Sequence, residues 1–95
     1  MYIVVSYWSA ESGKEKEFEE QSLKVKKTLL EQPGVAFIYT FKSGGSYVAV
    51  HGYDSESVYN QLVNDPKGVF AQSMEENKLD AVGHWVKSDR GEDIV

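Results

Sequence analysis

Alternating hydrophobic and polar positions predict four β-strands in this chain. β-branched and aromatic residues gather in four short runs, as is typical of strands: residues 2–8, 35–42, 47–53 and 81–87. Successive side chains of a strand point to opposite faces of its sheet. In the third run, Tyr47, Ala49, His51 and Tyr53 therefore share one face. The other face of that run is aliphatic.

A period of three to four residues predicts a helix from Lys14 to Glu31. Its apolar stripe is expected to pack on the sheet, and it consists of Phe18, Ser22, Val25 and Leu29. Leu23 and Leu30 lie on the flank of this stripe. They are expected to cover an edge of the sheet or to contact a second subunit.

A second, broken helix is predicted after the third strand. Asp54 or Ser55 can cap a first piece that runs to about Asn64. Asp65 and Pro66 are expected to restart the helix, with aspartate as the cap and proline in the first turn. The second piece should end near Leu79. The predicted buried side chains of both pieces are Val58, Tyr59, Leu62, Val63, Val69, Phe70 and Met74.

Gly44-Gly45 predicts a tight hairpin turn that sets the register of two strands. Ile38 then lies opposite His51, Tyr39 opposite Val50, and Phe41 opposite Val48. The large apolar face is expected under the helices, and it comprises Phe37, Tyr39, Phe41, Val48 and Val50. The other face is expected to line a cavity, and it comprises Ala36, Ile38, Thr40, Ala49, His51 and Tyr53. The even positions of the first strand, Tyr2 to Trp8, are placed with this second set.

The predicted order of elements is β, α, β, β, broken α, β, which is typical of an α+β ferredoxin-like sandwich with an antiparallel sheet. Residues 1–95 are expected to form one domain. Residues 88–95 carry several charges and are expected to be flexible or to contact a partner.

Composition excludes several classes of function. The formal net charge is -5 and the isoelectric point is about 4.9, so binding to nucleic acid is not expected. Without cysteine, the chain has no disulfide, thiolate nucleophile or cysteine-ligated metal. Neither a basic leader nor a long apolar run follows Met1, so we expect a cytoplasmic protein that does not bind membranes.

His51 and Tyr53 are the best candidates for catalytic residues. Side chains two apart on a strand project in parallel, so an imidazole and a phenol can share one ligand. The histidine could act as a general base, and the tyrosine could hold an oxygen of the substrate. The alternative is a histidine paired with a polar neighbour at a subunit contact.

Other polar and aromatic residues give weaker signals. Trp8 could stack on a planar ligand or anchor an interface, and Ser6 could donate one hydrogen bond. His84 and Trp85 are consecutive and point to opposite faces, so they cannot form one site, and His84 is expected to contact the tail or to lie at the surface. The two histidines lack the spacing of a metal site, and no metal is predicted.

The chain resembles the antibiotic-biosynthesis-monooxygenase-like (ABM-like) group of the dimeric α/β-barrel superfamily. The residues that carry this resemblance extend over nearly the whole chain: Gly13-Lys14, Phe18, Pro33-Gly34-Val35, Val48 to Glu56, Leu62, Asp65-Pro66 and Phe70. They are features of the fold more than of catalysis.

The resemblance implies a homodimer whose two sheets face each other, with one pocket per subunit between sheet and helices. Members include cofactor-independent oxygenases of phenolic polycycles and quinols, haem-degrading monooxygenases and small-molecule isomerases. His51 and Tyr53 stand where members often carry glutamate and tryptophan. Ser6 and Met74 stand where haem degraders carry asparagine and the axial histidine, so haem is not predicted.

The sequence therefore predicts a homodimer that binds a small planar or phenolic molecule and needs no cofactor. The expected site comprises His51 and Tyr53 as catalytic residues and Ser6, Trp8, Ile38, Thr40, Phe70 and Met74 as the substrate-binding wall. Such a site suits a cofactor-independent monooxygenase or an isomerase. The alternative is a non-catalytic module for dimerisation or ligand binding.

Overall fold

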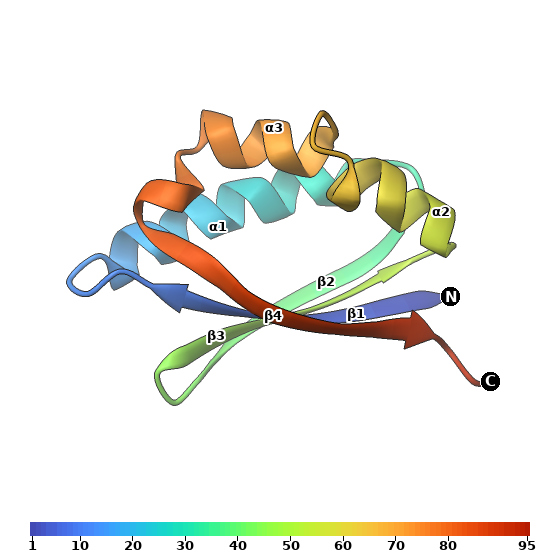
Figure 1. Cartoon of the computed structure of the whole chain (residues 1–95), viewed down its shortest axis with the longest axis horizontal. Helices are drawn as coiled ribbons and strands as arrows, with labels where there is room; N and C mark the ends of the chain where they lie inside the picture. The colour runs from blue at the N-terminus through green and yellow to red at the C-terminus, as the bar shows by residue number, and fades with distance from the viewer.

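A computed structural model describes all 95 residues, and its centre is a four-stranded antiparallel sheet in the order β2-β3-β1-β4 (Figure 1). The strands are β1 (Tyr2–Ala10), β2 (Val35–Ser43), β3 (Ser46–Tyr53) and β4 (Gly83–Glu92). Each βαβ half leaves one strand between its own two, which is the ferredoxin-like topology. The predicted α+β fold is confirmed.

All helices lie on one face of this sheet (Figure 1). They are α1 (Glu15–Leu30), α2 (Glu56–Tyr59), the π-helical turn η1 (Asn60–Asn64), α3 (Val69–Glu76) and the 3₁₀ turn η2 (Leu79–Ala81). No helix is both long enough and apolar enough to cross a bilayer.

The apolar stripe of α1 packs on the sheet as predicted. Phe18, Val25 and Leu29 are buried together with Ile38 of β2. Leu79 and Val82, near the start of β4, complete this cluster. Leu23 and Leu30 on the flank of the stripe are exposed. The spacing of apolar residues thus identified the face of α1 that is buried.

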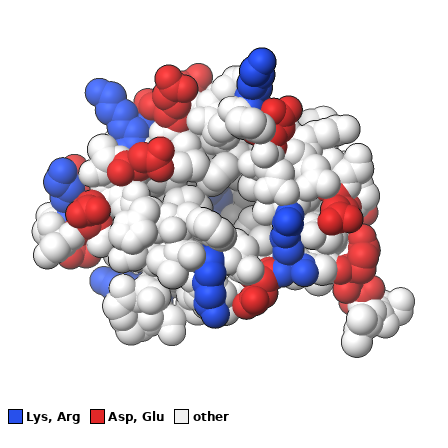
Figure 2. All heavy atoms as spheres, viewed as in Figure 1, with Lys and Arg blue, Asp and Glu red and all other residues white.

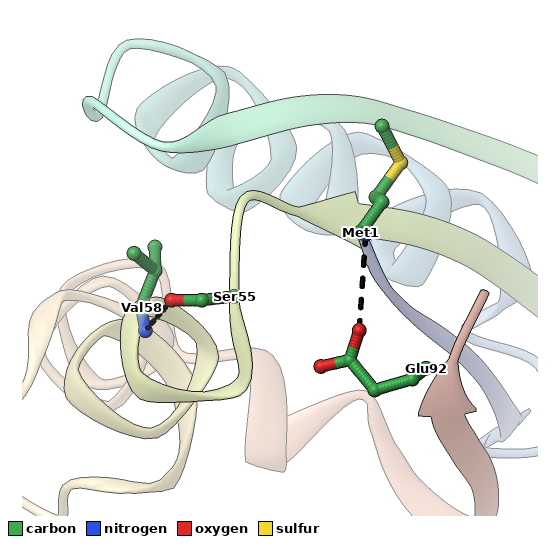
Figure 3. Close-up of polar contacts among 4 residues, drawn as sticks. All are labelled: Met1, Ser55, Val58 and Glu92. Carbon is green, nitrogen blue, oxygen red and sulfur yellow. Dashed lines mark hydrogen bonds and ion pairs between the residues drawn. The ribbon is translucent and has the colours of Figure 1, made fainter.

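The broken helix begins as predicted but restarts later. The Ser55 hydroxyl accepts a hydrogen bond from the Val58 amide at 3.2 Å, which caps α2 (Figure 3). Asp65 was expected to cap the second piece, but its carboxylate accepts only from the Lys67 amide, in a turn. Gly68 is the residue before α3. Because a residue before proline favours extended backbone, Asp65 ends the first piece instead.

The predicted hairpin register is confirmed, but the helices cover the opposite face to the one expected. Ile38 pairs with His51, and both are buried beneath the helices. The apolar face is open: Tyr39 is 66 % exposed and Phe41 51 % exposed. Right-handed crossovers between parallel strands decide which face the helices cover, whereas side-chain alternation defines only two faces. Tyr2, Val4, Ser6 and Trp8 lie with His51, as predicted.

Strand β4 is longer than the sequence pattern indicated. It was expected to end at Lys87 but pairs with β1 as far as Glu92. A register shift between Tyr7 and Trp8 places Trp85 opposite Trp8. At the far end, the Glu92 carboxylate lies 3.8 Å from the amino group of Met1 (Figure 3). The charged residues 88–92 therefore belong to the sheet.

Gly83 on β4 provides a test of the packing between α1 and the sheet. A Cβ atom there would overlap the Phe18 ring and lie 2.8 Å from the backbone oxygen of Ser9. We expect Gly83→Ala to lower the free energy of unfolding by about 1–3 kcal/mol, because the core is overpacked. Chemical denaturation monitored by circular dichroism measures this change.

Gly91→Ala is the matched control on the same strand. A Cβ atom at Gly91 meets nothing within 4 Å, so the free energy of unfolding should change by less than about 0.5 kcal/mol. Equal effects of the two substitutions would contradict the close packing of Phe18 on Gly83.

Candidate functional site

A cavity of about 840 Å³ lies between the helices and the sheet. Its volume is within the range of roughly 300–1,000 Å³ that is typical of small-molecule sites. In the view of Figure 2, the surface is hollowed between the helix layer and the sheet. Both edge strands contribute to the lining, with Thr40 from β2 and Ser88 from β4. The cavity therefore extends across the width of the sheet.

Aromatic rings form much of the wall of this cavity. The rings of Trp8 and Phe70 meet edge to face with their centroids 6.2 Å apart. Phe18 lies 6.4 Å from Trp8 and 4.9 Å from Tyr47. Rings in such contacts hold each other in place and leave planar faces for a ligand. The wall is suited to a flat, largely apolar molecule.

Polar groups enter this wall as one buried hydrogen-bonded chain. The Tyr53 hydroxyl lies 2.7 Å from Nδ1 of His51. Nε2 of His51 lies 3.3 Å from Oγ of Ser6, which also accepts a hydrogen bond from Nε1 of Trp8 at 3.1 Å. Strands β1 and β3 build this chain, because their register places Ser6 and Val4 beside His51.

The direction of these hydrogen bonds follows from the burial of Tyr53. Its side chain is 0 % exposed, and its hydroxyl has no partner other than His51. A buried hydroxyl that failed to donate would cost about 1–3 kcal/mol, so Tyr53 donates to Nδ1. Nε2 then carries the ring proton and donates to Ser6. The Ser6 hydroxyl accepts twice, and its own hydrogen remains free for a ligand.

Burial also determines the charge of these groups. It lowers the pKa of His51 from 6.5 to about 4, since the imidazolium would lose its hydration. Burial raises the pKa of Tyr53 well above 10, and the nearby Tyr59 adds to this effect. Both side chains are therefore neutral at pH 7.

Most of the predicted site residues meet in this cavity. Its lining includes Ser6, Trp8, Ile38, Thr40, His51, Phe70 and Met74. Tyr53 does not line the cavity, since it lies behind His51 and contacts the ring through Nδ1. His84 is exposed, and its Nδ1 lies 4.0 Å from a carboxylate oxygen of Glu11. No group of three potential metal ligands is present.

Three lining residues of β4 were not among the predicted site residues. Trp85, Ser88 and Arg90 of β4 all line the cavity. Trp85 lay within the predicted strand, but the charges of residues 88–93 indicated a tail that is flexible or contacts a partner. Tyr59 was predicted to be buried, but its place in the cavity wall was not foreseen.

Comparison with known proteins identifies the fold of this chain but not its activity. No protein-family model and no curated protein matches the chain by sequence. SnoaB, a cofactor-independent oxygenase from Streptomyces nogalater, superposes with a TM-score of 0.77 at 15 % identity, over 97 % of this chain and 91 % of SnoaB. This chain has an ABM-like fold.

Two further structures have the same ABM-like fold. A candidate antibiotic biosynthesis monooxygenase from Nitrosomonas europaea gives a TM-score of 0.73 at 14 % identity, over 100 % of both chains. A protein of unknown function from the same organism gives a TM-score of 0.76 at 11 % identity, over 99 % of this chain and 89 % of that protein's chain. At such identities the likeness concerns the fold alone. The activity has to be argued from the cavity.

The buried imidazole predicts how stability depends on pH. Between pH 6.5 and about 4 the unfolded chain binds a proton at His51 that the folded protein does not bind. The contribution of the neutral His51 to the free energy of unfolding is therefore complete above pH 6.5, and it is lost as the pH falls toward 4. It amounts to about 3 kcal/mol of unfolding free energy. Urea denaturation over this pH range measures it.

His51→Gln provides the comparison, because glutamine does not titrate. Carboxyl groups contribute equally in both proteins, so the wild type should lose about 3 kcal/mol more than the variant between pH 7 and pH 4. An identical decline in both proteins would contradict the neutral, buried state of His51.

Proposed function

We propose that the protein binds a small phenolic or quinol-type molecule in this cavity and acts on it as a cofactor-independent monooxygenase. The observation that carries this proposal is a cavity with aromatic walls into which the free Ser6 hydroxyl, at the end of a buried neutral chain, can donate a hydrogen bond. The ABM-like fold, shared with a cofactor-independent oxygenase, agrees with it.

In this proposal Ser6 donates a hydrogen bond to the phenolic oxygen of the ligand. A donor held in place favours the anionic form of that oxygen, because the charge gains a hydrogen bond at no cost of reorganisation. The phenolic proton is released to water. The electron-rich anion passes one electron to dioxygen, and the resulting superoxide forms a bond to a ring carbon. The peroxide anion takes up a proton from water, and loss of water from the hydroperoxide leaves a quinone.

His51 and Tyr53 have a positioning role in this scheme. With Nδ1 accepting from Tyr53 and Nε2 donating to Ser6, the imidazole has no lone pair free for a substrate proton. The base role predicted for His51 would need the tautomer with the ring proton on Nδ1. In that tautomer the buried Tyr53 hydroxyl would have no acceptor for its hydrogen. The chain of hydrogen bonds instead orients the Ser6 hydroxyl.

The same observation favours a second candidate function, a non-catalytic module that only binds its ligand. His51 has a pKa of about 4 and is therefore a weak base. The cavity thus has no group that removes a proton efficiently at pH 7. Binding of the ligand with no consumption of dioxygen would distinguish this candidate from the oxygenase.

Ligand binding can be tested with a panel of naphthols and naphthohydroquinones. We expect millimolar 1-naphthol or 1,4-naphthohydroquinone to raise the melting temperature of the wild type by a few degrees, because a ligand stabilises the state that binds it. Ser6→Ala should weaken binding about fivefold to tenfold through the lost hydrogen bond. An oxygen electrode measures turnover in the same samples.

Ser9→Ala is the matched control, since Ser9 lies on the same strand and outside the cavity lining. It should bind and react like the wild type. The absence of any shift across the panel would contradict a ligand cavity.

We also propose that the protein is a homodimer through the open face of the sheet. Phe37 and Tyr39 stack there with their centroids 5.3 Å apart, beside the exposed Phe41. Large exposed aromatic side chains on one face are typical of a protein interface. A domain of this size also gains stability by burying more surface.

Sedimentation equilibrium tests the homodimer. We expect a dimer at micromolar concentration, and Tyr39→Lys should shift it to monomer, because a buried lysine would lack a partner. Leu23→Lys places the same charge on the exposed flank of α1, and the dimer should persist. A stable monomer of the wild type, or dissociation by Leu23→Lys alone, would overturn this interface.

A further inference from the structure

Two indole-serine pairs lie side by side on the cavity face of the sheet. Nε1 of Trp8 donates to Ser6 Oγ at 3.1 Å, and Nε1 of Trp85 donates to Ser88 Oγ at 2.8 Å. Ser6 and Ser88 are direct partners in the register of β1 and β4. Side chains of such partners lie about 5 Å apart on one face.

Each pair leaves a hydroxyl hydrogen unused. An indole N–H can only donate, so each serine oxygen is an acceptor in its pair. With His51 Nε2 donating as well, neither Ser6 nor Ser88 gives its own hydrogen to an acceptor in the protein. Two adjacent hydroxyl groups can thus both donate to a ligand in the cavity.

Arg90 brings a positive charge to the same place. It lies two residues beyond Ser88, opposite Val4, on the cavity side of β4. Its guanidinium group lies over the Tyr59 ring, with Cζ 5.2 Å from the ring centroid. This contact favours a position of the guanidinium group over the Tyr59 ring, which also lines the cavity.

No carboxylate forms a salt bridge with Arg90. The nearest acidic residue along the strand on the same face, Glu92, is paired with the amino group of Met1 (Figure 3), and Arg90 has no salt bridge. The one carboxylate in the cavity lining is Glu19 of α1, which accepts the Tyr47 hydroxyl at 2.6 Å. Tyr47 is on β3, away from β4 in the sheet. The β4 side of the cavity therefore has donors and a cation without a salt-bridge partner, although Glu56 of α2 acts on the same Tyr2 hydroxyl as Arg90.

We propose that Arg90, Ser6 and Ser88 form an anion-binding subsite, and that the ligand of the cavity is an aromatic carboxylate. This inference rests on the proposed function, since it assumes that the cavity holds a planar aromatic molecule. A guanidinium fork matches the two oxygens of a carboxylate, and the two hydroxyl groups can complete its hydrogen bonds. The aromatic body then lies against Trp8 and Phe70.

A pair of matched ligands tests this subsite in the full-length protein. 1-Hydroxy-2-naphthoate and 1-hydroxy-2-naphthamide differ in the charge of one substituent, and 1-naphthol lacks the substituent. By titration calorimetry, we expect the wild type to bind the carboxylate at least tenfold more tightly than the amide. Arg90→Gln should abolish this preference and leave the affinity for the amide within twofold of the wild type.

Two further variants locate the effect. Lys27→Gln removes the same charge from an exposed position of α1 outside the cavity lining, and the preference for the carboxylate should remain. Ser88→Ala should reduce the affinity for the carboxylate about threefold to tenfold with less effect on 1-naphthol. Because Arg90 and Ser88 are not in the hydrophobic core, circular dichroism should show that both variants remain folded.

The possible results separate this inference from the proposed function. Equal binding of carboxylate and amide by the wild type, or a preference that survives Arg90→Gln, would overturn the subsite and leave the aromatic site intact. If none of the three compounds binds, the aromatic site fails and the subsite fails with it.

Discussion

The hydrogen bonds of one buried imidazole determine how the covered face of the sheet is built. His51 lies beneath the helices with only 8 % of its surface exposed, so both ring nitrogens need partners inside the protein. Tyr53 supplies a donor to Nδ1, and Ser6 supplies an acceptor to Nε2. Tyr53 lies two residues along the same strand, and Ser6 lies diagonally across on β1, where Val4 is the direct partner of His51. The polar chain, the neutral charge state and the free Ser6 hydroxyl follow from this one requirement.

The cavity combines two environments that suit different parts of a ligand. Trp8, Phe18 and Phe70 provide an apolar wall, and burial of apolar rings supplies most of the binding free energy in such sites. The β4 side adds hydrogen-bond donors and the charge of Arg90, which in our proposal orient the ligand. This division explains how a protein with an excess of acidic residues can present an electropositive subsite.

The two faces of the sheet have separate roles in our proposals. The covered face holds polar side chains that a ligand can use, and the open face holds aromatic side chains that a second subunit can bury. A surface with Tyr39 and Phe41 exposed is costly for a monomer, whereas a dimer would bury it. The polar groups proposed to bind the ligand and the aromatic stack proposed to form the interface therefore lie on different faces of the sheet.

Much of the fold followed from local patterns. The period of α1, a cap at Asp54 or Ser55, the Gly44-Gly45 turn and the pairing of Ile38 with His51 were predicted correctly, because each depends on neighbours within a few residues or on one hairpin. The restart of the broken helix was placed too early, since the extended backbone before Pro66 outweighed the capping tendency of Asp65.

The sequence by itself determined which residues share a face, and so it grouped Ser6, Trp8, Ile38, Thr40 and His51 correctly. Only the tertiary structure decided which face the helices cover, because alternation is symmetric and the handedness of the crossovers is not. It also decided that Ser88 and Arg90 join the site, since the pairing of β4 with β1 is a contact between distant parts of the chain. The direction of the His51 hydrogen bonds likewise depended on the complete burial of Tyr53, which no local pattern contains.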